Sequence, residues 1–314
     1  MASLPPLFRK IAHRSLRPVS ALIKRGVLGA FPRPDVGGIN YDEPLGDPGL
    51  FGAHSAVWRI HSDFPGMLAG GLAALTLQTL HPLALAGVWD HSNFRGDLLG
   101  RLRRTTTFVG GTTYAPLEPA EALIERVRKI HLHITGHGED GRPYAANDPH
   151  LLTWVHVTEA YCFLQGYRRY SHIALPDGAA DRYYNEVRLI AEALGARDVP
   201  RTEHGVVSYF QQMQNELAFT ERSRVVLEFL AQVQLPLPAA GLSRDVFLHA
   251  SAALLPEWAT TLLQHSARQQ RKAKVAARVM WSIAPLFRAA LKDGIASRAC
   301  HRVGVAPEQL QHWP

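Results

Sequence analysis

Apolar residues recur every three or four positions along most of the chain, which is the spacing of amphipathic α-helices. In residues 117–136 the apolar stripe runs through Ala120, Ile124, Val127 and Ile134, with position 131 completing the spacing. Pro119 near the start and Gly136 at the end predict where this helix begins and stops. Period-two runs flanked by turn dipeptides, which indicate strands, are nearly absent. The pattern predicts an all-α fold.

A histidine occupies position 131 of that apolar stripe, and two more follow it closely. At about 100° per residue, His133 lies about 200° further round the helix than His131 and faces away from the stripe. His137 follows the predicted stop at Gly136 and is expected in a loop. The three side chains are therefore not expected to converge on one metal ion. His131 itself is either a hydrogen-bonded core histidine or a haem ligand, and periodicity alone leaves both open.

Residues 65–89, PGMLAGGLAALTLQTLHPLALAGVW, contain no charged side chain over a length that could cross a bilayer. Gln78 and His81 are polar, and Pro82 is expected to kink or end a helix near residue 80. We therefore expect a helix buried on all sides by its neighbours rather than a membrane span. Its small residues would let a second helix or a flat ligand approach closely.

Composition divides the chain into three parts. Residues 1–34 hold seven lysines and arginines and no acidic residue, and are expected to form a basic amphipathic arm. Residues 35–49 are rich in Pro, Gly and Asp, which indicates a linker, and residues 50–314 are expected to form a single helical domain. The arm either contacts a membrane surface peripherally or lies on its own protein.

The net charge of +7 favours anionic partners, but no nucleic-acid recognition motif accompanies it, so no nucleic-acid partner is expected. Cys162 and Cys300 are far apart and form no CxxC pair, which excludes a disulfide framework and fits a reducing compartment. The expected location is cytoplasmic, with attachment at the membrane surface left open.

A second candidate constellation lies in RLRRT, residues 101–105. On a helix, Arg101, Arg104 and Thr105 share one face because they are three and four positions apart. Such a face is either solvated or directed at a bound anion or dioxygen. His156, on another predicted helix, is either a satisfied core histidine or a group facing the same pocket.

Several short motifs follow one another in a distinctive order: HP at His81, HS at His91, RxxRT from Arg101, VRxxH…G around His131, and the block YAANDPHLLTWVH. Over about residues 45–200 this order resembles the family of rubber oxygenases (latex-clearing proteins) and the mycophenolic-acid pathway oxygenase. Such a relationship implies a globin-like, all-α helical core with additional helices, containing b-type haem and iron.

The resemblance implies that His131 is the proximal iron ligand and metal-binding residue. It implies catalytic roles for Arg101, Arg104 and Thr105, with Arg104 and Thr105 polarising bound dioxygen and Arg101 supporting them or a haem propionate. His156 is included among the expected cofactor-binding residues. Arg104 stands where relatives have lysine, and an arginine effectively never loses its proton, so it is not expected to bind iron.

The expected substrates are dioxygen and an apolar molecule. The resemblance to the family implies that this apolar molecule is an unsaturated isoprenoid or lipid chain. Relatives that cleave polyisoprene use a glutamate as base in a segment where this chain is uncharged, so rubber cleavage is not carried over. The alternative function is a non-catalytic carrier of haem or of a hydrophobic ligand with the same helices.

Overall fold

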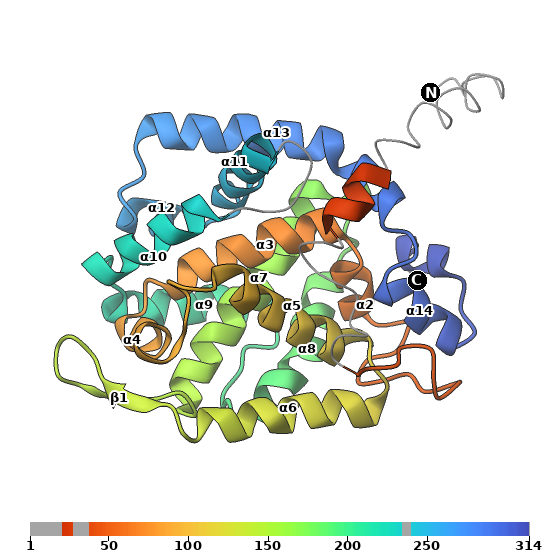
Figure 1. Ribbon diagram of the computed structural model, residues 1–314, viewed down its shortest axis with the longest axis horizontal. Coiled ribbons are helices and arrows are strands. Elements are labelled where there is room, and N and C mark those ends of the chain that lie inside the picture. The colour runs from red at the N-terminus through yellow and green to blue at the C-terminus, as the bar shows by residue number, and fades with distance from the viewer. Residues whose placement is uncertain (1–20, 28–37, 234–239, 314) are drawn as a thin grey trace.

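The computed structural model describes residues 21–27, 38–233 and 240–313, and helices make up most of them (Figure 1). The α-helices are α2 (Ala56–His61), α3 (Phe64–Gln78), α4 (Pro82–His91), α5 (Leu98–Tyr114), α6 (Leu117–His131), α7 (Pro149–Tyr170), α8 (Ala179–Leu194), α9 (Glu203–Met213), α10 (Glu221–Gln232), α11 (Ala240–Ala252), α12 (Glu257–Leu262), α13 (Ala267–Ala290) and α14 (Ile295–Arg302). The described residues also form two 3₁₀ helices, η2 (Gln214–Glu216) and η3 (Pro307–Gln311). The all-α prediction is confirmed.

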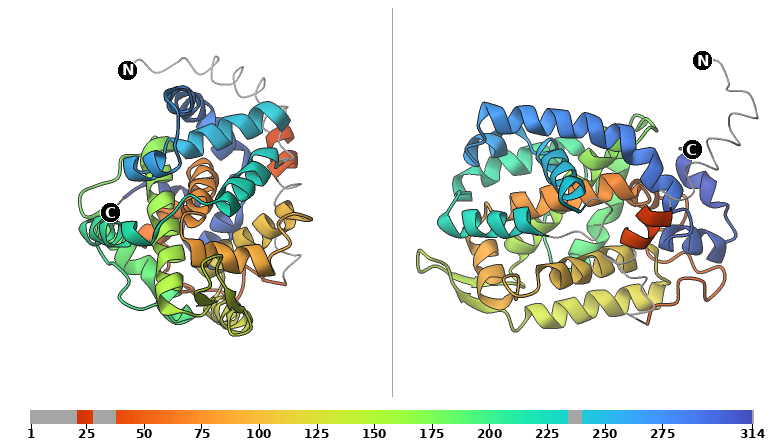
Figure 2. Two further views of the ribbon diagram at one scale, coloured as in Figure 1. Left: turned by 90° about the vertical axis from the view of Figure 1, so that its left-hand side faces the viewer. Right: turned by 45° about the horizontal axis from the view of Figure 1, so that its top comes forward.

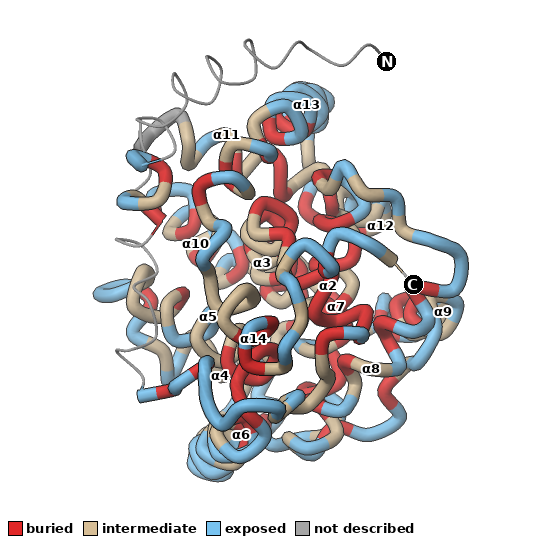
Figure 3. Tube along the Cα trace, turned by 90° about the vertical axis from the view of Figure 1, so that its right-hand side faces the viewer, coloured by how far each residue is buried: buried red, intermediate tan, exposed pale blue. Residues whose placement is uncertain are grey.

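Helix α3 lies at the centre, with α13 and α11 along one side of the molecule and α6 along the opposite side (Figures 1 and 2). Buried residues gather on α3 and α7, whereas the outer faces of α6 and α13 are exposed (Figure 3). The central pair is therefore enclosed by amphipathic helices, as their apolar stripes require.

Glycines let α3 and α7 approach each other until their backbones touch. A Cβ atom added at Gly70 would lie 2.7 Å from the carbonyl oxygen of Cys162, and one added at Gly66 would lie 2.9 Å from the carbonyl carbon of Gly166. The expectation that small residues permit a close helix–helix approach is confirmed.

The break predicted at Pro82 is also confirmed. Helix α3 ends at Gln78, and α4 begins at Pro82 with His81 as its N-cap, at a bend of 104° between the two helices. Among the described residues, no single helix is long and apolar enough to cross a membrane, although α3 and α4 meet the length and composition test as a bent pair.

A short antiparallel hairpin replaces the loop that was expected after α6. Strands β1 (Thr135–His137) and β2 (Pro143–Ala145) pair so that Gly136 lies opposite Tyr144. Helix α6 ends at His131, so the predicted stop at Gly136 and the loop position of His137 were wrong. Gly136 has a different role, because a Cβ atom there would lie 2.5 Å from the Tyr144 hydroxyl.

The described part of the N-terminal region packs on the helical body. Residues 21–27 are helical, with Ile23 and Val27 buried in the core and Lys24 paired to Asp293 at 2.8 Å. The rest of the basic arm lies outside the described residues, so its predicted membrane contact stays a prediction.

Residues 38–49, from the predicted linker, are hydrogen-bonded to the C-terminal region. The buried Arg302 of α14 donates hydrogen bonds to the carbonyl oxygens of Tyr41, Asp47 and Tyr114, at 2.8–2.9 Å. These bonds attach the segment to α5 and α14 together.

Candidate functional site

A large cavity of about 2220 Å³ lies among α3, α4, α5, α6 and α7. Ligand pockets commonly measure roughly 300–1000 Å³, so this one has room for more than one small molecule. Most of its wall is hydrocarbon; the apolar side chains include Leu68, Leu75, Leu83, Val88, Phe108, Val127, Val155 and Phe163. A cavity with this wall suits an apolar ligand, and its few polar groups are the candidates for chemistry.

His131 reaches the cavity as the last residue of α6. Ala120 and Ile124 are buried on the same stripe and Val127 is half-buried, so the predicted inward face of the helix is confirmed; His133 is exposed but lies beyond the end of α6. The His131 Nδ1 atom is buried without a hydrogen-bond partner, and no hydrogen bond of the described residues involves Nε2. Burial lowers the pKa of His131, so the ring is neutral at pH 7 and has a lone pair available.

Helix α7 directs two further ionisable groups at the cavity. His156 and Glu159 lie on one face of this helix, between Leu152 and Phe163, and all four side chains line the cavity. Burial lowers the pKa of His156 to about 4 and raises that of Glu159 to about 7. No hydrogen bond or ion pair in the described part of the chain includes either side chain. Both can therefore interact with a ligand or with water in the cavity.

Glu159 was not among the residues expected from the sequence, although a signal for it exists. It follows His156 by three positions and precedes Phe163 by four, so it falls on a helix face that is apolar apart from His156. A carboxylate on such a face is as unusual as the histidine at position 131, and the helical spacing that singles out His131 also singles out Glu159.

His61, on α2, also lines the cavity. It differs from His131 and His156 because both of its ring nitrogens are hydrogen-bonded. Its Nδ1 lies 2.8 Å from the Thr113 hydroxyl, which itself donates to the carbonyl oxygen of Val109. Nδ1 therefore carries the proton, and Nε2 accepts from the Tyr183 hydroxyl at 3.0 Å. Burial lowers the pKa of His61 to about 3, so it is a neutral structural histidine.

Arg101, Arg104 and Thr105 are all on α5 and all border the same cavity as His131. Arg101 is half-buried, and burial together with nearby Arg104 lowers its pKa. The side chain of Arg104 is 67% exposed and lies 3.9 Å from Asp97, while exposed Thr105 donates to the Arg101 carbonyl oxygen at 3.2 Å. Arg101 therefore reaches the inner wall, and the other two lie at the solvent-facing edge.

Replacing Glu159 by glutamine is expected to change how stability depends on pH. The pKa of Glu159 is raised in the folded state, so the folded protein favours the protonated carboxyl. Its contribution to the free energy of unfolding is fully present below about pH 4.5 and is lost as the pH rises through about 7. The glutamine variant cannot ionise, so its free energy of unfolding relative to wild type should rise by about 2 kcal/mol between pH 5 and pH 8. This figure is reduced from the full shift because Glu159 is only half-buried.

Urea unfolding at the two pH values measures this difference. Glu121→Gln, which removes an exposed carboxylate on α6, is the matched control and should follow wild type at both pH values. If the free energies of unfolding of Glu159→Gln and wild type changed equally between the two pH values, this carboxyl would not titrate in a buried environment.

Comparison with known proteins places these features in one family. Residues 58–284 match the family model described as "ER-bound oxygenase mpaB/B'/Rubber oxygenase, catalytic domain". The match covers well over half of the chain and includes α3, α4, α5, α6 and α7, whose side chains line the cavity. No curated protein and no solved structure gives a match. The chain belongs to the mpaB and rubber oxygenase catalytic-domain family, as its ordered motifs had indicated.

Proposed function

We propose that this protein is a b-type haem-dependent oxygenase that acts on an apolar, unsaturated isoprenoid or lipid-like substrate. The family supplies the oxygenase activity, and the haem, its ligand and the substrate are our inference. The observation that carries the proposal is His131, a neutral imidazole on the wall of a large hydrocarbon-lined cavity, whose ring nitrogens have no hydrogen-bond partner among the described residues.

The residues of the cavity fit a haem. An unpartnered buried nitrogen costs free energy in the absence of a ligand, and neutral imidazole is the form that binds iron. The half-buried Arg101 offers a cation for a propionate, and His156 offers a neutral ring on a second wall of the cavity. When bound there, haem would supply the dioxygen chemistry that amino-acid side chains cannot provide.

The side chains around the cavity divide the remaining tasks. The apolar wall would hold a hydrocarbon substrate and keep water away from it. Glu159, with a pKa of about 7, can accept or release a proton at its carboxylate near neutral pH. Arg104 would donate hydrogen bonds to dioxygen entering from the exposed edge, and Thr105 would do so once its hydroxyl turns away from the Arg101 carbonyl oxygen, which are roles we retain from the family pattern.

Haem uptake and oxygen consumption test the proposal. Purified protein titrated with haemin is expected to develop a Soret band that saturates at about one haem per chain. The reconstituted protein should then consume oxygen with squalene, an unsaturated isoprenoid, and not with squalane, its saturated counterpart. The absence of haem uptake would contradict the proposal, and haem uptake without oxygen consumption on any unsaturated chain would instead support the carrier function.

A further inference from the structure

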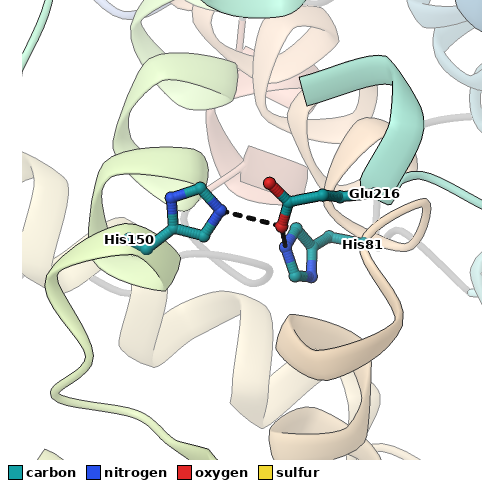
Figure 4. Close-up of side chains that lie close together, drawn as sticks. All are labelled: His81, His150 and Glu216. Carbon is teal, nitrogen blue, oxygen red and sulfur yellow. Dashed lines mark hydrogen bonds and ion pairs between the residues drawn. The ribbon is translucent and has the colours of Figure 1, made fainter. Parts of the chain in front are cut away.

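A second cluster of ionisable side chains lies outside the lining of the cavity, where three chain segments meet (Figure 4). His81 is the N-cap of α4, His150 lies in the first turn of α7, and Glu216 ends η2. The Glu216 Oε2 atom is 2.9 Å from the Nε2 atom of His150 and 3.6 Å from that of His81. One donor atom from each residue lies within 4.8 Å of the donor atoms of the other two.

The three side chains differ in exposure in a way that suits a binding site. The His81 side chain is 1% exposed, and its ring packs against Trp154 with the ring centroids 5.9 Å apart. His150 and Glu216 are partly open to solvent, with 46% and 39% of their side chains exposed. One donor is thus held rigidly by the protein, and a ligand can reach the cluster from the side of the other two.

Hydrogen bonding alone does not account for the cluster. Glu216 lies within hydrogen-bond distance of His150, but 3.6 Å is too long for a bond to His81. The buried Nε2 atom of His81 therefore has no hydrogen-bond partner among the described residues, although it points at the carboxylate. A buried polar atom in this position requires an explanation.

A metal ion placed among the three donors would explain it. Zinc binds imidazole nitrogen and carboxylate oxygen at about 2.0–2.2 Å, so tetrahedral donors lie roughly 3.4 Å apart. The two separations to Glu216, 2.9 and 3.6 Å, fall on either side of that value. Two histidines and one carboxylate, with a further position open to water, are a recurrent zinc ligand set.

Two features of the cluster oppose a cation and limit its affinity. The N-termini of α4 and α7 present partial positive charge, which the Glu216 carboxylate offsets. Metal binding at the Nε2 atom of His81 also places the ring proton on Nδ1, which now accepts a long bond from the Ala84 amide at 3.4 Å. We therefore expect a dissociation constant on the order of micromolar rather than the far tighter binding of closed structural zinc sites.

We propose that His81, His150 and Glu216 form a binding site for a divalent first-row transition metal, with Zn²⁺ as the best match. The ion would link α4, η2 and α7, and α4 and α7 also form walls of the cavity. The site is separate from the proposed haem site, so either can fail without the other.

Calorimetric titration of EDTA-treated full-length protein with ZnCl₂ tests the site. Wild type is expected to bind about one Zn²⁺ per chain with micromolar affinity, and His150→Gln and Glu216→Gln to bind it at least about tenfold more weakly. His81→Asn removes the third donor while keeping an N-cap side chain for α4, and should weaken binding to the same extent. His204→Gln, at an exposed histidine on α9, is the matched control and should bind as wild type.

Thermal unfolding provides a second readout. Excess Zn²⁺ should raise the Tm of wild type and of His204→Gln, and should raise the Tm of the three cluster variants by clearly less at the same Zn²⁺ concentration. Wild type that binds no zinc at about 100 μM would overturn the proposal. Cluster variants that bind zinc as wild type does would overturn it equally. The titration is performed on haem-free protein, so its result does not depend on the proposed oxygenase function.

Discussion

Replacing His131 by alanine is expected to abolish stable haem binding, whereas replacing His133 by alanine should leave it unchanged. The two residues are two positions apart near the end of α6, but His131 lines the cavity and His133 is exposed. Loss of the proposed iron ligand should weaken haem affinity by roughly 100-fold or more, equivalent to about 3 kcal/mol. Because the exposed control removes the same side chain, the contrast isolates the iron ligand from a general loss of histidine.

Soret absorbance during haemin titration measures the loss, and added imidazole provides a rescue test. The cavity has space for a free imidazole in place of the deleted ring, so millimolar imidazole should restore part of the Soret band in His131→Ala. Equal haem binding by His131→Ala and wild type would show that another residue holds the iron. Far-ultraviolet circular dichroism establishes that the variants keep their helices.

Gly166→Ala is expected to destabilise the protein by about 2–4 kcal/mol, although alanine is the better helix former. A Cβ atom at Gly166 would lie 2.2 Å from the carbonyl oxygen of Gly66, so the neighbour in the way is backbone and cannot rotate aside. Helices α3 and α7 would have to separate, which would open the core at their contact. The roughly 1 kcal/mol gained in helix propensity does not offset that loss.

Gly71→Ala is the matched control for this prediction. Gly71 lies on α3, but a Cβ atom there would be 3.7 Å from the Phe163 ring, which is ordinary van der Waals contact. This variant should be unchanged or more stable by up to about 1 kcal/mol. Urea unfolding of both variants measures the difference in stability. Equal stabilities would mean that the close contact between α3 and α7 does not determine the stability of the protein.

Features set by local sequence could be predicted without the structure. The spacing of Ala120 and Ile124 fixes which side of α6 faces inward, and it therefore singles out His131. Pro82 interrupts a helix wherever it occurs, because its ring removes a backbone donor. Both predictions depend on residues within a few positions of each other.

Features set by distant contacts could not be predicted in the same way. The hairpin that follows α6 depends on Tyr144, whose hydroxyl donates to the Asp90 carboxylate at 2.6 Å across 54 positions. The His81 cluster joins segments that are far apart in sequence. Spacing placed Arg104 and Thr105 on one helix face, but the prominent exposure of that face follows from how α5 packs.

The hydrogen bonds from Arg302 to residues 38–49 affect the order in which the parts of the protein fold during synthesis. Tyr41 precedes Arg302 by 261 positions, so its carbonyl oxygen leaves the ribosome long before its donor does. Contacts this far apart in sequence are slow to close, because a long loop must first be ordered. The segment is made long before Arg302 and is therefore late to reach its place, and until then the Tyr41 side chain is open to chaperones.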